Sequence, residues 1–225
     1  MSEPFAVVFA IYPGLTQLDF TGPFEVMSRL PGANVVVASR EGGAVAADTG
    51  LVFAATKRLA DVDRCDLLCV PGGPGVEAAS LDQAFLAEIR RLSAGARYTT
   101  SVCTGSLILG AADLLQGKRA ACHWAWRDLL PLFGAIPVED RVVRDGNVIS
   151  GGGVTAGIDF ALTAAAEIAG ERIARAIQLS LEYAPQPPFR SGTPQEAGEE
   201  LVKVIQPLFA GRKQAFAAAH AKATA

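Results

Sequence analysis

The chain has 225 residues, half of them hydrophobic and 19% charged, and a formal net charge of −3. This size and composition predict a single domain over residues 1–225, and the weak negative charge excludes the basic field that binding to nucleic acid or an anionic membrane requires. No apolar run reaches the roughly 18 residues of a membrane span and the N-terminus lacks the basic region of a signal peptide, so we expect a cytoplasmic protein with no membrane partner.

Strand and helix signals alternate in the first half of the chain. Strands are expected at residues 5–11, 34–39, 44–47, 51–54 and 66–70, and helices at about 24–30 and 81–92. The strand at 5–11 is a continuous apolar run, which indicates a strand covered on both faces. The helix at 24–30 is expected to begin near Pro23, because proline suits the first helical turn.

The second half of the chain continues the alternation. Strands are expected at residues 98–102, 119–122, 141–144 and 147–150, and helices from 107 and at about 124–133, 155–168 and 171–182, with a mostly helical, Ala-rich tail over about 190–225. Asp145-Gly146 is a strong hairpin signal between the last two strands. The pattern predicts an α/β fold with a doubly wound, mainly parallel sheet and helices on both faces.

One short stretch carries the main functional signal. Residues 98–102 favour a strand, and the chain from Leu107 onward favours a buried helix. Only Cys103 and Thr104 separate the strand from Gly105, which predicts a tight corner of the kind that presents a nucleophile. A helix N-terminus is expected to lower the pKa of a thiol placed there. We therefore interpret Cys103 as a nucleophile rather than a small core residue.

The loops at the carboxyl ends of the strands hold the other candidate site residues. These ends meet at one edge of a parallel sheet, so Asp19, Gly72-Gly73 and Cys103 should share a cleft. Asp19 is the candidate acid–base partner of the thiol, with a turn or capping role as the alternative. The N–H groups of Gly72, Gly73 and Thr104 are candidates for binding negative charge on a substrate, although Gly-Gly pairs also occur in ordinary turns.

The two histidines and the other cysteines have mainly structural interpretations. His123 either pairs with Cys103 or packs beside the tryptophans that follow it, whereas His220, in the tail, is expected at the surface. Cys69 and Cys122 are expected in the core as reduced thiols. The scattered cysteines contain no C-x-x-C pair, so no metal site is expected.

A loop of three glycines is also interpreted as structural. Gly151-Gly152-Gly153 precedes a predicted helix, and glycine permits a tight passage from strand to helix. No lysine or phosphate-loop pattern follows these residues, so they do not indicate a nucleotide site.

Six stretches of the sequence match one known family. They are Leu18-Asp19-Phe20-Thr21-Gly22-Pro23, Val70-Pro71-Gly72-Gly73, Ser101-Val102-Cys103-Thr104-Gly105-Ser106, His123-Trp124, Gly151-Gly152-Gly153-Val154-Thr155-Ala156-Gly157-Ile158-Asp159-Phe160 and Glu182-Tyr183-Ala184-Pro185-Gln186-Pro187-Pro188-Phe189. From Phe5 to about Phe189 the chain resembles the PfpI-type branch of the class I glutamine-amidotransferase-like superfamily. The resemblance implies a flavodoxin-like fold and a homodimer.

Within this branch the chain is most similar to the members that add water to isocyanides, which also carry Asp where many relatives have Glu. The resemblance implies that Cys103 is the nucleophile, Asp19 the acid–base group and Thr104 a partner of the reacting groups. Attack of the thiolate on the terminal isocyanide carbon would give a thioimidate, and its hydrolysis would give an N-substituted formamide. This hydro-lyase chemistry needs no cofactor.

Other classes of protein share parts of the pattern. AraC-type regulators carry the stretches around Asp19 and Gly151, but they add two helix-turn-helix units, and the segment after Phe189 is short and lacks a basic recognition helix. Glyoxalase- or deglycase-like enzymes, stress chaperones and redox sensors keep the cysteine. Asp19 in place of Glu argues against these last classes.

Overall fold

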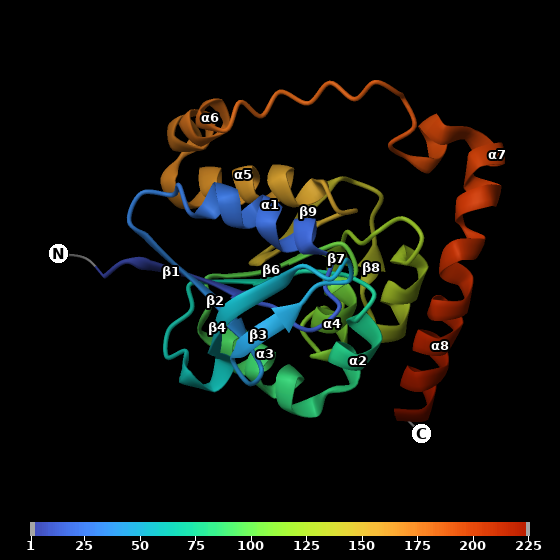
Figure 1. Cartoon of the computed structure of the whole chain (residues 1–225), viewed down its shortest axis with the longest axis horizontal. Coiled ribbons are helices and arrows are strands. Elements are labelled where there is room, and N and C mark those ends of the chain that lie inside the picture. The colour runs from blue at the N-terminus through green and yellow to red at the C-terminus, as the bar shows by residue number, and fades with distance from the viewer. Residues whose placement is uncertain (1–2, 224–225) are drawn as a thin grey trace.

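The computed structural model describes residues 3–223, and an eight-stranded sheet lies at its centre (Figure 1). The strand order is β3-β4-β2-β1-β5-β6-β10-β9. These strands are β1 (Phe5–Ala10), β2 (Ala33–Ser39), β3 (Gly43–Ala46), β4 (Val52–Arg58), β5 (Leu67–Val70), β6 (Tyr98–Val102), β9 (Val142–Asp145) and β10 (Val148–Gly151). A separate two-stranded sheet pairs β7 (Arg119–Ala120) with β8 (Ile136–Pro137).

The inner six strands of the large sheet run parallel. Only the edge strands β3 and β9 pair antiparallel with their neighbours. The strand β1 is completely buried from Val7 to Ala10, as its apolar sequence predicts for a strand covered on both faces. The prediction of a doubly wound, mainly parallel sheet is confirmed.

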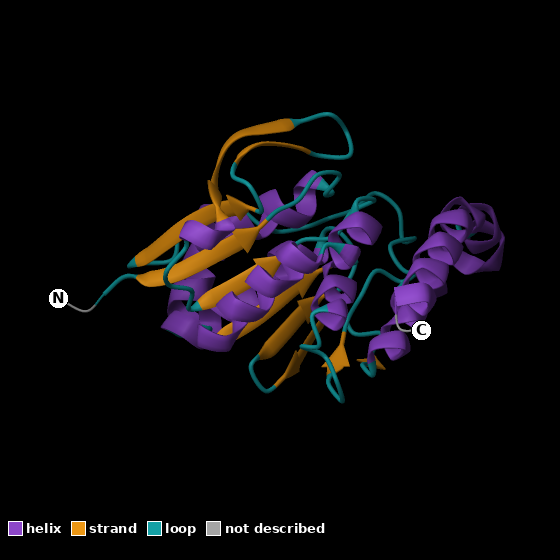
Figure 2. Cartoon of the chain, turned by 90° about the horizontal axis from the view of Figure 1, so that it is seen from below, coloured by secondary structure: helices purple, strands orange, loops and turns teal. Residues whose placement is uncertain are grey.

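Helices cover both faces of the sheet (Figures 1 and 2). One face carries α1 (Gln17–Met27), α5 (Ala156–Ala169) and α6 (Glu171–Ser180), and the other carries α2 (Val76–Leu81), α3 (Gln83–Gly95) and α4 (Gly105–Ala111). Two short 3₁₀ helices are η1 (Leu59–Asp61) and η2 (Arg127–Phe133), and the tail forms α7 (Pro194–Ile205) and α8 (Pro207–Ala223). None of the helices within residues 3–223 is long and apolar enough to cross a membrane.

The helix that carries Asp19 begins earlier than predicted. Helix α1 starts at Gln17, with Thr16 as its N-cap residue, so Asp19 lies in the first helical turn and not in a loop. The prediction assigned Pro23 to the first turn, whereas Pro23 lies inside the helix. A carboxylate is favourable in a first turn because the helix dipole places partial positive charge there.

The segment predicted as a helix at 124–133 is instead mostly the 3₁₀ helix η2. Pro131 lies inside it, and proline removes one of the backbone donors that a regular α-helix needs. The predicted strand at 119–122 is reduced to the two residues of β7.

The tail packs against the rest of the molecule through an aromatic face of α8. Phe216 is fully buried and contacts the rings of Trp126 and Phe133 at centroid distances of 6.0 and 6.2 Å. His220, one turn further on, stacks on Phe216 at 4.2 Å and is buried. The expectation that His220 lies at the surface is wrong, because residues four apart on a helix share one face and this face is covered.

Candidate active site

The nucleophile elbow forms where β6 ends. Cys103 has a φ of 59°, an unusual value for a residue with a side chain, and α4 begins two residues later. The Cys103 N–H donates to the carbonyls of Gly151 and Gly152 at 3.1 and 2.8 Å, which ties the elbow to the three-glycine loop. A Cβ on Gly105 would lie 2.1 Å from the Val70 carbonyl oxygen, so only glycine fits at this position.

The carboxyl group of Asp19 is fully buried beside this elbow. The Gly72 N–H donates to its Oδ2 atom at 3.0 Å. The second oxygen, Oδ1, has no conventional hydrogen-bond partner within residues 3–223. The loops converge closely, since a Cβ on Gly72 would lie 2.5 Å from the Thr104 nitrogen and 2.8 Å from Asp19 Oδ2. Buried carboxyl oxygens usually have a partner, and the side chain of Cys103 is the group that interacts with this carboxyl group in addition to the Gly72 N–H.

Burial dominates the electrostatics of this pair. It raises the pKa of Asp19 from 3.8 to about 7, although hydrogen bonds from the Cys103 thiol and the Gly72 N–H act in the opposite direction. Burial and the nearby Asp19 carboxylate raise the pKa of the Cys103 thiol well above 9.0, against a hydrogen bond from the Thr104 N–H. The prediction of a lowered thiol pKa is therefore wrong, because desolvation and Asp19 outweigh the helix N-terminus.

The N–H groups of the Gly-Gly loop are bonded within the protein. The Gly72 N–H donates to Asp19, and the Gly73 N–H donates to Thr104 Oγ1 at 3.0 Å. Charge binding by the Gly72 or Gly73 N–H remains a prediction, and it would require one of these bonds to open. The bonds themselves fix the positions of the Asp19 carboxyl group and the Thr104 side chain relative to the sulfur.

A cavity of about 290 Å³ adjoins the sulfur. Cys103, Thr104, Gly73 and His123 line this Cys103 cavity, together with Thr16, Asp48, Pro74, Trp126, Val154, Phe209 and Arg212. Cys103 is only 5% exposed, so the cavity is the route by which a small molecule would reach it. Of the residues predicted to share a cleft, Gly73, Cys103 and Thr104 line this cavity, whereas Asp19 and Gly72 do not line it and join the site through their contacts with each other and with the elbow.

His123 lines the cavity as an aromatic wall residue. Its Nδ1 atom accepts a hydrogen bond from the Ala125 N–H at 3.3 Å, and its ring lies 5.8 and 5.2 Å from the rings of Trp124 and Phe209. Burial lowers the pKa of His123, which favours the neutral ring. No hydrogen bond joins His123 to Cys103 in the part of the chain that the structure describes, so packing is the interpretation that these contacts favour.

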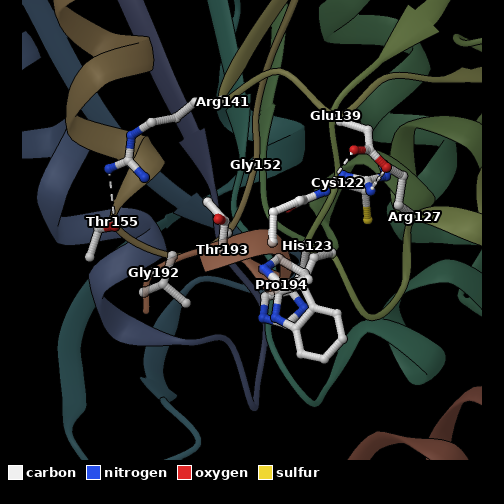
Figure 3. Close-up of a pocket in the computed structure, with 14 residues that line it drawn as sticks. Cys122, His123, Arg127, Glu139, Arg141, Gly152, Thr155, Gly192, Thr193 and Pro194 are labelled. Atoms are coloured by element: carbon white, nitrogen blue, oxygen red, sulfur yellow. Dashed lines mark hydrogen bonds and ion pairs between the residues drawn. The ribbon is translucent and has the colours of Figure 1, made fainter. Parts of the chain in front are cut away.

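A neighbouring cavity of about 410 Å³ shares His123 and Val154 with the Cys103 cavity. Figure 3 shows His123 and Pro194 among the side chains that line it. Its charged groups are engaged in ion pairs, since Arg127 pairs with Glu139 within the lining and Arg141 pairs with Asp159 outside it. Gly192 and Thr193, which precede α7, also line this neighbouring cavity.

Sequence reasoning missed the contribution of the tail to the site. Phe209 and Arg212 of α8 line the Cys103 cavity, although they lie more than a hundred residues after Cys103. A signal was present: Phe209, Phe216 and His220 recur at the spacing of one helix face. The alanines between them masked this pattern.

Residues 6–167 match the DJ-1/PfpI family. The chain belongs to this family. The isonitrile hydratase of Pseudomonas putida is 54% identical over 194 residues, which cover 86% of this chain and 85% of that protein. A solved structure of a THiJ/PfpI family protein from Pseudomonas syringae is similar with a TM-score of 0.93 and 40% identity, covering 96% of this chain and 90% of that chain.

A regulator also resembles part of the chain. The HTH-type transcriptional regulator CdhR of Pseudomonas aeruginosa is 28% identical over 185 residues, which cover 78% of this chain but only 53% of that protein. This DJ-1/PfpI family chain is therefore similar both to an enzyme and to part of a transcription factor. The chemistry of its own site has to show which of these two functions it resembles.

Proposed function

We propose that this protein hydrates isocyanides to N-substituted formamides, with Cys103 as the nucleophile and Asp19 as the acid–base group. The observation that carries the proposal is the buried pair itself: the Asp19 carboxyl group lies beside the Cys103 thiol, and burial raises the pKa of both groups, that of Asp19 to about 7. A group with a pKa near the working pH both accepts and returns a proton readily. The 54% identity to an isonitrile hydratase supports the choice of substrate.

The first step adds the thiol across the isocyanide carbon. The Asp19 carboxylate accepts the proton of Cys103 as the sulfur attacks the terminal carbon, and it then returns that proton to the same carbon. The product is a thioimidate, R–N=CH–S–Cys103, which contains every atom of the substrate and of the thiol. A thiol that stays protonated until attack suits this sequence, because its own proton is the one that the carbon needs.

The second step releases the product with water. Asp19, ionised again, activates a water molecule that attacks the thioimidate carbon, and the nitrogen takes up a proton. Loss of the Cys103 sulfur then gives R–NH–CHO and restores the thiol. Thr104 supports the sulfur when it is negative, because its N–H bonds to the sulfur and lowers the thiol pKa. One water molecule is consumed in each cycle and no cofactor takes part.

The test compares substrate classes under one set of conditions. The purified protein is incubated with cyclohexyl isocyanide or with methylglyoxal, and N-cyclohexylformamide and lactate are quantified by chromatography. We expect formamide at a steady rate and no lactate above the enzyme-free control. Lactate formation without formamide would replace the proposal with a glyoxalase-like activity.

A redox-sensing role is the alternative that the site supports less well. Thiolates react with peroxides much faster than thiols, and redox sensors therefore hold a cysteine of low pKa at an accessible position. Cys103 has a raised pKa and is 5% exposed. Both properties fit a nucleophile that is activated only when a substrate enters the cavity.

The resemblance also leads us to propose a homodimer in the cytoplasm. The four cysteines are free thiols, which suits a reducing compartment. Leu179 on α6 and Phe189 after it are 81% and 77% exposed, which suits a face that a second copy covers. Sedimentation equilibrium of the purified protein tests the dimer, since a single species of 23.4 kDa would contradict it.

A further inference from the structure

Part of the wall of the Cys103 cavity lies outside the matched family region. The family match ends at residue 167, whereas Phe209 and Arg212 come from the C-terminal helix α8. In Figure 1 this helix runs along one side of the sheet, apart from the helices that cover its two faces. Asp19 and Cys103 therefore come from the matched family region, whereas α8 completes the wall of the cavity beside Cys103.

Helix α8 holds Phe209 in place through contacts on the same face. The Lys213 ammonium group lies 2.7 Å from the Asp128 carboxylate, and Phe216 is fully buried one turn later. Phe209 itself contacts two rings, those of His123 at 5.2 Å and Trp124 at 6.1 Å. An aromatic side chain fixed in this way forms a rigid wall, because moving it would separate the helix from its aromatic contacts.

The size and charge of the cavity limit what can bind beside Cys103. Its volume of about 290 Å³ is at the lower end of the range for small-molecule sites. Asp48 and Arg212 give its lining one charge of each sign, Trp126, Val154 and Phe209 are apolar, and Thr16 and Thr104 add uncharged hydroxyl groups. Such a lining favours a compact, uncharged group over a large or ionic one.

We propose that Phe209 is a specificity-determining residue, which restricts the site to isocyanides with a compact, uncharged N-substituent. The inference rests on the proposed function and specifies its substrate class. Phe209 and Cys103 both line the cavity, so we expect the Phe209 ring to contact the N-substituent of an isocyanide whose terminal carbon lies at the sulfur. Removing the ring lengthens the space available to the substituent and leaves Cys103 and Asp19 in place.

The test measures a ratio of specificities. kcat/KM is determined for cyclohexyl isocyanide and for the longer 4-biphenylyl isocyanide, in the wild type, Phe209→Ala and Leu208→Ala. Leu208 is the matched control, because it is the neighbouring residue of α8 and is 70% exposed. We expect Phe209→Ala to raise the biphenylyl-to-cyclohexyl ratio by about tenfold or more, and Leu208→Ala to leave it unchanged. An unchanged ratio in Phe209→Ala, with the wild-type melting temperature, would overturn the inference.

A second measurement separates this inference from the proposed function. Cys103 is alkylated with iodoacetamide or with the bulky N-(1-pyrenyl)maleimide, and the modified peptide is quantified by mass spectrometry. Burial raises the pKa of Cys65, Cys69 and Cys122 to about 12 each, so these thiols should react slowly. The modified peptide that contains Cys103 is quantified separately from the peptides that contain the other three cysteines. The inference predicts that Phe209→Ala speeds the maleimide reaction relative to iodoacetamide, even if the protein hydrates no isocyanide. Phe209→Leu keeps an apolar side chain against His123, and its maleimide-to-iodoacetamide rate ratio is expected to lie between those of the wild type and Phe209→Ala. Equal relative rates in all three proteins would contradict the inference, whereas failure of hydration alone would remove only the proposed function.

Discussion

Asp19 is the residue whose chemistry most depends on its surroundings. An aspartate in water is ionised above about pH 4, but burial beside Cys103 raises the pKa of Asp19 to about 7. In the proposed mechanism Asp19 must start as a carboxylate, because it accepts the thiol proton. Activity should therefore depend on the fraction of Asp19 that is ionised.

This requirement predicts the pH dependence of catalysis. kcat/KM for an isocyanide should rise as the pH increases through about 7 and level off above it, since the carboxylate form then predominates. The profile is measured from pH 5 to 9 with a neutral substrate, so that only the enzyme titrates. A flat profile over this range would show that no group with the pKa of Asp19 controls the reaction.

Replacing Asp19 by asparagine tests the same role by removing the proton acceptor. The amide oxygen of Asn can still accept the hydrogen bond that the Gly72 N–H donates, so we expect the fold to persist. The rate should fall by about 10²–10⁴, the usual contribution of a positioned acid–base group. The measurement is kcat for Asp19→Asn beside circular dichroism of the same sample, and wild-type kcat would reduce Asp19 to a structural residue.

Asp19 should also make the stability of the protein depend on pH. Its pKa is about 7 when folded and near 3.8 when unfolded, so between these values the folded state binds more protons than the unfolded state. The contribution of Asp19 to the free energy of unfolding therefore falls as the pH rises from about 4 to about 7, by at most on the order of 4 kcal/mol, and this contribution is constant above pH 7. Urea unfolding at pH 4.5, 6 and 8 should show this slope in the wild type and lose it in Asp19→Asn. Identical slopes in both proteins would contradict the assignment.

At the scale of elements, the turn from β6 into α4 depends on close backbone packing at Gly105. A Cβ there would meet the Val70 carbonyl oxygen at 2.1 Å. The start of α4 and the end of β5 would therefore have to move apart. Gly105→Ala should lower the free energy of unfolding by about 2–3 kcal/mol. Gly95→Ala is the matched control, because a Cβ at the end of α3 meets nothing within 4 Å. Equal urea midpoints for the two variants would show that the elbow tolerates a side chain.

The loop that carries His123 is interpreted as part of the cavity wall. His123→Ala removes a ring that packs against Phe209 and should raise KM for an aryl isocyanide several-fold while kcat changes less. A catalytic base would give a different result, namely a fall in kcat comparable with that of Asp19→Asn and a changed pH profile. Steady-state kinetics of both variants on one substrate distinguish these outcomes.

At the scale of the whole molecule, the sequence predicts the sheet well and the environment of the site less well. Continuous apolar runs such as β1 indicate buried parallel strands directly, and the β6–Cys103–α4 corner is visible as a change of periodicity over a few residues. The pKa of Cys103 is not visible in this way, because it depends on burial and on Asp19, which lies 84 positions away in the sequence (103 − 19). The raised pKa is a tertiary property.

The position of the tail could not be predicted for a related reason. Helix propensity indicates that α8 is a helix, but it does not indicate which part of the molecule the helix covers. Phe209 becomes part of the site because α8 is held by contacts such as those of Phe216 with Trp126 and Phe133 elsewhere in the chain. Long-range contacts between separate elements thus decide which residues surround the nucleophile.

The most direct test of the account is the release of formamide by the wild type and by Cys103→Ser, measured side by side with cyclohexyl isocyanide. Serine keeps the size of the side chain but is a far weaker nucleophile, and folding is verified by circular dichroism of both proteins. The account predicts steady formation of N-cyclohexylformamide by the wild type and none above the enzyme-free control by Cys103→Ser. Comparable rates in the two proteins would contradict covalent catalysis by Cys103.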